Sequence, residues 1–67
     1  MSVLHVVPAE RIGDGWKVVG ADAAERRVPC QADAVEDACL ELRYEGGEVV
    51  IHDLRGRVRD KRTVRPG

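Results

Sequence analysis

Five short runs rich in β-branched residues predict the strands of this chain. They cover residues 3–8, 16–19, 26–28, 48–53 and 57–64. Pro8 ends the first run because proline has no backbone N–H to donate to a neighbouring strand. The last run is polar, and its charged side chains suit the edge of a sheet. The connections, at residues 13–15, 20–25 and 54–56, contain the glycines typical of turns and loops.

A single helix is predicted over residues 31–45, which hold no Gly, Pro or Thr and are rich in Ala, Glu and Leu. Its apolar positions follow the i, i+3, i+4, i+7 spacing of one helix face. These positions are Val35, Ala38, Cys39 and Leu42, and Ala34 widens the stripe. Gly46 and Gly47 supply the C-terminal stop.

The elements follow one another in the order β-β-β-α-β-β. Short turns between strands predict an antiparallel sheet with the helix packed on one face, which is an α+β fold. The matching apolar faces predict one core, made of Leu4 or Val6, Trp16, Val18, Val35, Ala38, Leu42, Val49 and Ile51. At 67 residues the chain forms one small domain over residues 1–67, with a basic strand or tail at residues 55–67.

These segments also resemble a short bacterial family. The motifs, in chain order, are His5-Val6-Val7-Pro8, Gly15-Trp16-Lys17-Val18, the Ala-rich helix, Gly46-Gly47-Glu48-Val49-Val50-Ile51-His52 and Gly56-Arg57-Val58-Arg59-Asp60. In this order they resemble domain of unknown function family 2188, from His5 to about Thr63. The resemblance implies the order of the elements and a bacterial origin, and it supplies no catalytic residues.

Composition argues against several classes of protein. The formal net charge is only −1 and valine is abundant, so disorder is not expected. No apolar run approaches the ~20 residues of a membrane span, and no signal-peptide pattern is present, so we expect a cytoplasmic protein with no membrane partner. Cys30 and Cys39 are separated by roughly 13 Å along the predicted helix, which is too far for a disulfide. With His5 and His52 they form no closely spaced ligand pair, so neither a metal nor a cofactor is expected.

Few residues offer catalytic chemistry, and the chain is predicted not to be an enzyme. The hydroxyl candidates Ser2 and Thr63 lie near the chain ends, where order is least reliable. Cys30 is a candidate thiolate at the start of the helix; alternatively it is a small residue at the cap position. The Gly13-Asp14-Gly15 turn precedes a strand, so it lacks the helix N-terminus of a phosphate-binding loop.

Charge is divided unevenly along the chain. Residues 1–54 hold 5 basic and 11 acidic side chains, a balance of −6, whereas residues 55–67 hold 6 basic and 1 acidic, a balance of +5. Every second residue from Arg55 to Lys61 is basic, which on a strand forms a cationic ridge able to track a phosphate backbone. The candidate nucleic-acid contacts are Arg55, Arg57, Arg59, Lys61 and Arg62. The alternative is an edge strand that its charges protect from mispairing, and only Trp16 and Tyr44 are aromatic.

The most apolar strands carry valine or isoleucine on both faces, yet one helix about 10 Å wide covers only one face of a sheet. The uncovered face is therefore the predicted self-association surface, with Val3, His5, Val7, Val50 and His52 as its residues. The two histidines can face each other across the sheet, one can act as a base, or both can be structural. The leading prediction is a small interaction domain that binds a protein partner or forms a homodimer. The alternative is a nucleic-acid-binding module.

Overall fold

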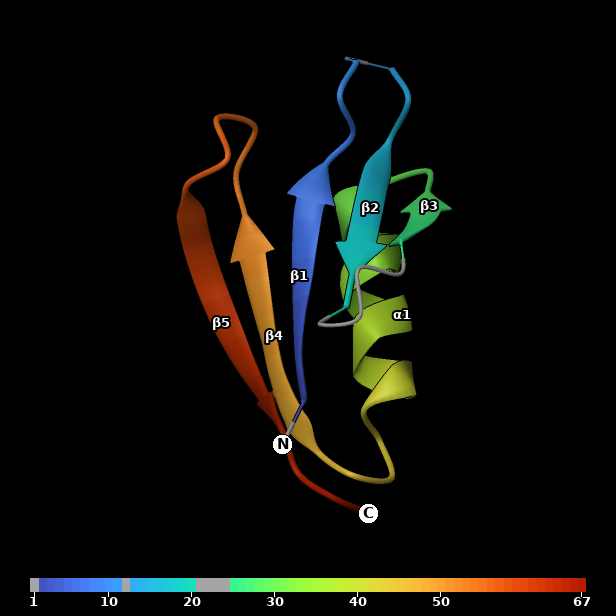
Figure 1. Ribbon diagram of the computed structural model, residues 1–67, viewed down its shortest axis with the longest axis vertical. Helices are drawn as coiled ribbons and strands as arrows, with labels where there is room; N and C mark the ends of the chain where they lie inside the picture. Colours follow the sequence, from blue (N-terminus) through green and yellow to red (C-terminus); the bar gives the residue numbers. More distant parts are fainter. Residues whose placement is uncertain (1, 12, 21–24) are drawn as a thin grey trace.

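The computed structural model describes residues 2–11, 13–20 and 25–67 (Figure 1). Its elements are β1 (Ser2–Pro8), β2 (Trp16–Val19), β3 (Glu25–Val28), α1 (Gln31–Glu41), β4 (Gly47–His52) and β5 (Val58–Val64). The predicted order β-β-β-α-β-β is confirmed, and each strand lies within one residue of its predicted bounds. Most of the loop predicted at residues 20–25 falls on residues 21–24, outside the described part of the chain.

The five strands form one mixed sheet in the order β3-β2-β1-β4-β5. The prediction of a purely antiparallel sheet is wrong at its centre, where β1 and β4 run parallel and Leu4 lies beside Val49. Two antiparallel pairings, of β1 with β2 and of β2 with β3, leave β3 running in the same direction as β1. The helix then carries the chain back to the starting end, so that β4 also runs parallel to β1.

Helix α1 is shorter than predicted: it ends at Glu41, whereas the prediction extended it to residue 45. Leu42 forms its C-cap, and the Leu42 N–H still donates to the Ala38 carbonyl at 3.2 Å. The next residues turn toward Gly46, whose N–H donates to the Leu42 carbonyl at 2.7 Å. Gly46 adopts a positive φ of 76°, so the chain leaves the helix as soon as Leu42 is buried.

The core lies between α1 and the sheet, as predicted. Its buried members are Leu4, Val6, Val18, Ala34, Ala38, Leu42, Val49 and Ile51, with Trp16, Val28, Val35, Cys39 and Val64 packed partly buried against them. Two alanines at the centre of the helix stripe allow the helix backbone to approach the sheet closely.

The helix does not cover the sheet evenly. It packs against β1, β2, β3 and β4, while β5 lies at the opposite edge of the sheet from β3 and extends away from the helix (Figure 1). The side of β5 that faces the helix layer is therefore exposed, apart from half-buried Val64. This uneven cover leaves two surfaces open, which are the helix-side groove along β5 and the whole opposite face of the sheet.

Candidate functional site

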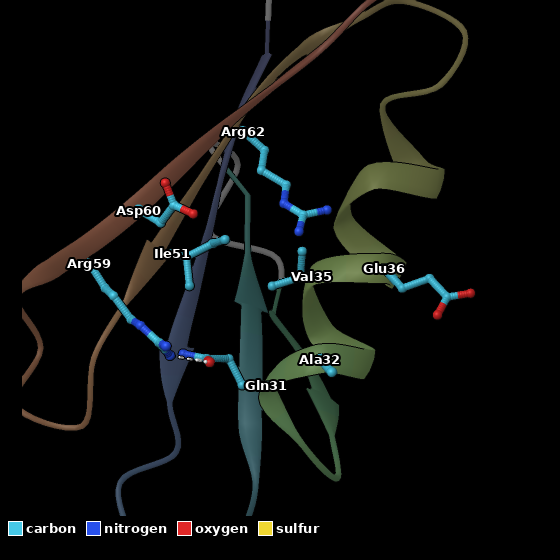
Figure 2. Close-up of a pocket in the computed structure, with 8 residues that line it drawn as sticks. All are labelled: Gln31, Ala32, Val35, Glu36, Ile51, Arg59, Asp60 and Arg62. Atoms are coloured by element: carbon cyan, nitrogen blue, oxygen red, sulfur yellow. Dashed lines mark hydrogen bonds between the residues drawn. The ribbon is translucent and has the colours of Figure 1, made fainter.

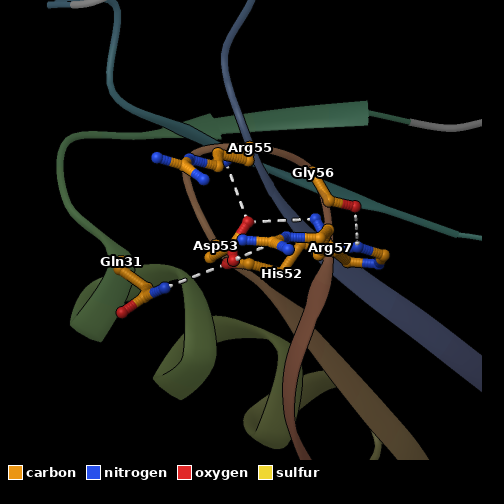
Figure 3. Close-up of polar contacts among 6 residues, drawn as sticks. All are labelled: Gln31, His52, Asp53, Arg55, Gly56 and Arg57. Atoms are coloured by element: carbon orange, nitrogen blue, oxygen red, sulfur yellow. Dashed lines mark hydrogen bonds and ion pairs between the residues drawn. The ribbon is translucent and has the colours of Figure 1, made fainter.

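The turn between β4 and β5 is organised by one carboxylate. The Oδ1 atom of Asp53 accepts the backbone N–H of Arg55 at 2.8 Å and that of Arg57 at 3.0 Å (Figure 3). The Asp53 N–H donates to the Arg57 carbonyl at 2.8 Å, and Gly56 N–H donates to the Asp53 carbonyl at 3.0 Å. Gly56 has a φ of 82°, a conformation that glycine adopts without steric cost. These bonds fix the backbone from which two arginine side chains project.

The same contacts change the acidity of Asp53. The backbone N–H of Arg57 stabilises the charged carboxylate and holds the pKa of Asp53 below its ordinary value of 3.8, with the Arg55 N–H acting in the same direction. The guanidinium Nε of Arg57 lies 3.8 Å from Oδ2, which adds a weaker coulombic attraction. The Asp53 carboxylate therefore stabilises the turn, and its oxygens are already engaged by these N–H groups and by Arg57.

His5 and His52 do face each other across the open face of the sheet. Nδ1 of His5 lies 3.0 Å from Nε2 of His52, and Nδ1 of His52 lies 3.0 Å from the Gly56 carbonyl. A carbonyl oxygen only accepts, so His52 carries its proton on Nδ1. Nε2 of a neutral His52 is then an acceptor, and His5 donates from its own Nδ1. The pair forms a directed chain that ties β1 through β4 to the turn.

Gln31, the first residue of α1, joins the helix to both edges of this turn. Its Nε2 donates to the His52 carbonyl at 3.1 Å, and its Oε1 accepts from Nη1 of Arg59 at 2.8 Å. The single amide thus fastens the start of the helix to the carboxyl end of β4 and to the beginning of β5. The Arg59–Gln31 bond also separates two hollows in the surface, because both residues line each of them.

The first hollow, which we call the basic pocket, has a volume of about 480 Å³. It is lined by Trp16, Gln31, Asp53, Leu54, Arg55, Arg57 and Arg59. The three arginines are exposed, and they outnumber the single carboxylate. The pocket lies at the carboxyl ends of β1 and β4, beside the start of α1.

The second hollow, which we call the helix groove, lies between α1 and β5 and has a volume of about 470 Å³. Its lining residues are Gln31, Ala32, Val35, Glu36, Ile51, Arg59, Asp60 and Arg62. Arg62 extends from β5 toward the helix above Val35, while Glu36 points outward (Figure 2). Two carboxylates against two guanidinium groups leave this groove without a net charge.

The predicted cationic ridge does not exist as one row. Strand β5 begins only at Val58, so Arg55 and Arg57 belong to the turn, where residues do not alternate between faces. A register shift between Ile51 and His52 then interrupts the alternation beside Arg59. The five candidate residues are consequently divided: Arg55, Arg57 and Arg59 line the basic pocket, Arg62 lines the helix groove, and Lys61 pairs with Val50 on the open face.

Sequence reasoning missed the role of Trp16 in this pocket. Trp16 fits the predicted core and does pack against it, but it is only half-buried and its remaining surface lines the basic pocket. The local signal was its position at the start of β2, directly after a turn. The antiparallel pairing of Trp16 with Pro8 fixes it at the end of the sheet where the arginines lie.

The predicted self-association residues occupy one face of the sheet. Leu4, Val6, Val49 and Ile51 point into the core, so the alternating residues Val3, His5, Val7, Val50 and His52 lie on the opposite face. Val3 is 39% exposed, and His5, Val7 and His52 are half-buried. Val50 is only 7% exposed within the single chain, because neighbouring side chains on the face already cover it.

One arginine and two carboxylates join strand β3 to helix α1. Arg26 of β3 binds two carboxylates of α1, with Nη2 lying 2.7 Å from Asp37 and Nη1 bonded to Glu41. The bond to Glu41 is the largest influence that raises the pKa of Arg26, and Asp37 adds to it. Arg26 is therefore paired with two carboxylates, whereas the lining of the basic pocket holds three arginines and one carboxylate, Asp53, which forms an ion pair with Arg57.

The described residues offer neither a cluster of metal ligands nor a helix that could cross a membrane. Across residues 2–11, 13–20 and 25–67, no three His, Cys, Asp or Glu side chains lie where they could hold one metal ion. Cys30 is exposed and Cys39 is half-buried, and both are free thiols. In the described part of the chain, α1 is neither long nor apolar enough to cross a membrane.

Comparison with known proteins gives one match. A family model described as "Uncharacterized protein conserved in bacteria (DUF2188)" matches residues 4–64. No curated protein and no solved structure matches the chain. The matched span begins inside β1, at Leu4, and ends with β5, so it includes the helix, the basic pocket and all of the sheet except the first two residues of β1. The family predicted from the motifs is confirmed, and the chain belongs to this family of bacterial proteins.

Proposed function

We propose that the chain is a small interaction domain that associates with a second copy of itself through the open face of its sheet. The observation that supports this proposal is the apolar centre of that face. His5 lies between Val19 on β2 and Val50 on β4, with Val3 and Val7 two residues away on its own strand. Four valines therefore surround one histidine on a face that has no covering layer within the described residues.

Charged groups of both signs surround this apolar centre. The ammonium of Lys17 lies 3.3 Å from the Glu25 carboxylate, and Glu48 and Lys61 lie on the β4 and β5 side. A twofold axis brings the same surface of two copies together, so a face with both signs can meet itself without net repulsion. An apolar centre with a polar rim is the usual composition of such contacts.

Burial within the single chain decides which residues form the contact. Val50 is almost fully covered by its own neighbours, so the contact area comes mainly from Val3, with contributions from His5, Val7 and Val19. Placing a charge at Val50 would disturb the fold itself. Val3 is 39% exposed near the start of β1, so a charge there changes the surface while leaving the core in place.

The test is the mass in solution. At about 100 μM, above the Kd of a micromolar dimer, we expect sedimentation to give twice the chain mass of 7.4 kDa. Val3→Asp should return the mass to that of one chain, while Leu40→Asp should not, because Leu40 is exposed on the helix at the other side of the sheet. A wild-type monomer at this concentration, or equal effects of the two variants, would contradict the proposal.

A second candidate is contact with nucleic acid, supported by the gathering of Arg55, Arg57 and Arg59 around one pocket. Binding of this kind depends on phosphate neutralisation and weakens steeply with salt. We expect salt-sensitive retention on a heparin column that falls when Arg55 and Arg59 are replaced by glutamate. The same replacement at Arg65, which lies outside the pocket, is the matched control. Retention that does not change with salt, or that does not fall in the Arg55 and Arg59 variant, would exclude this candidate.

A further inference from the structure

We infer that the basic pocket is a nucleotide subsite, in which the base contacts Trp16 and the phosphate contacts Arg55 and Arg59. This inference rests on the nucleic-acid candidate above and is independent of self-association. It adds what that candidate lacked, which is a surface for the base. A phosphate-binding patch alone needs only cations, whereas a nucleotide site needs a cationic and an aromatic wall on one cavity.

The cationic wall, formed by Arg55, Arg57 and Arg59, has guanidinium N–H groups that are free to bind a phosphate. Asp53 is the one carboxylate in the lining, and its charge is taken by two backbone N–H groups and by Arg57. Among the described residues, Arg55 and Arg59 have no carboxylate partner. Arg59 donates one bond to the neutral amide of Gln31, and the other N–H groups of its guanidinium remain available. Planar guanidinium groups bind phosphate oxygens in a bidentate manner.

The apolar wall is formed by Trp16 and Leu54. Trp16 is anchored on its core side and presents its remaining surface to the pocket. Leu54 is 77% exposed in the β4–β5 turn, and its side chain lines the same pocket. A volume of about 480 Å³ suits a small organic ligand, since such sites commonly enclose ~300–1,000 Å³.

The pocket is held in shape before any ligand arrives. The Asp53 carboxylate fixes the backbone of Arg55 and Arg57, and Gln31 is fixed by the His52 carbonyl. The His52 ring lies against the Gly56 carbonyl (Figure 3), and Nδ1 of His5 contacts its other ring nitrogen. The backbone of the pocket therefore needs little further ordering on binding, which favours affinity for a small ligand.

The helix groove does not offer the same chemistry. Glu36 and Asp60 offset Arg59 and Arg62 there, and its lining contains no aromatic ring (Figure 2). An anion entering that groove meets as many carboxylates as cations. The combination of excess positive charge with an indole is therefore specific to the basic pocket.

Trp16 is the only tryptophan of the chain, so its fluorescence reports on this pocket directly. Thymidine monophosphate added to the wild-type protein up to about 10 mM should quench the emission in a saturable way. This range is wide enough to saturate a site whose Kd is about 1 mM. Ribose 5-phosphate carries the same phosphate without a base, so it should compete with the nucleotide but not quench by itself. An oligothymidylate of eight residues should quench at lower concentration if the source in the cell is single-stranded nucleic acid.

Variants separate the two walls. Arg55→Ala and Arg59→Ala should each raise the Kd for thymidine monophosphate by about tenfold, as expected for a lost hydrogen bond to a charged group. Arg65→Ala should leave this Kd unchanged. Far-UV circular dichroism verifies that each variant folds. Equal quenching by ribose 5-phosphate, no saturable quenching, or equal loss in Arg65→Ala would overturn the nucleotide subsite. Salt-sensitive heparin retention without Trp16 quenching would overturn this inference alone, and absence of both would overturn the nucleic-acid candidate as well.

Discussion

Replacing Leu42 with alanine should remove a large part of the stability of this domain. Leu42 is 1% exposed and is among the largest fully buried side chains of the core. Buried Leu→Ala changes cost ~2.7–5 kcal/mol, because the lost transfer free energy is joined by the cost of the cavity. Leu42 lies against Gly47, at a point where β4 is held in the sheet centre between β1 and β5, so the site cannot collapse fully. We therefore expect about 3–4 kcal/mol.

This loss is large compared with the total free energy of unfolding of the domain. A domain of 67 residues at ~0.05–0.15 kcal/mol per residue has a free energy of unfolding of roughly 3–10 kcal/mol. Urea unfolding followed by circular dichroism measures the change, and Leu40→Ala is the matched control on the same helix. Leu40 is 53% exposed, so its replacement should change the free energy by less than about 0.5 kcal/mol. Similar unfolding midpoints for the two variants would refute the assignment of the buried helix face.

Three further changes probe the turns and the charges. Gly47→Ala should cost about 2 kcal/mol or more in urea unfolding, because the new Cβ would overlap the Ser2 carbonyl across the parallel pair, whereas Gly13→Ala meets no atom within 4 Å and should cost less. The lowered pKa of Asp53 stabilises the fold at pH values above its ordinary 3.8, and this contribution is lost as pH falls through the lower folded value. Asp53→Asn should therefore flatten the decline of the melting temperature at acidic pH, and an unchanged slope would contradict the turn geometry. Arg26→Gln should cost less than about 1 kcal/mol despite its two ion pairs, because both are largely exposed, and a loss several times larger would show that they act as a buried network.

Local patterns were sufficient to predict the elements and the core. The helix stripe around Ala38 and Leu42 and the β-branched runs around Val6 and Val49 identify which faces are buried, since each follows the period of its own element. Strands β1 and β4, whose apolar residues on both faces predicted a self-association surface, lie in the interior of the sheet. The length of the helix was overestimated because Leu42 is buried by turning inward as a cap, a detail that propensity does not encode.

The parallel pairing of β1 with β4 could not be read from the turns, because it depends on the direction in which the helix returns the chain. Short connections between the other strands correctly indicated antiparallel neighbours. In the structure the helical connection makes β4 follow the direction of β3, and two reversals make that the direction of β1. The error was thus one of long-range geometry, while the order of elements and the family assignment were correct.

That same long-range geometry creates the basic pocket. In parallel strands the carboxyl ends meet at one edge of the sheet, and a connecting helix begins at that edge, which is why open α/β sheets bind ligands there. Here the ends of β1 and β4, the first residue of α1 and the start of β2 all reach this edge, although they are far apart in sequence. An antiparallel arrangement would have placed the Asp53 turn elsewhere, away from Trp16. The indole and the arginines therefore become neighbours only through the crossover, and a strand-by-strand search for a charged ridge could not have paired them.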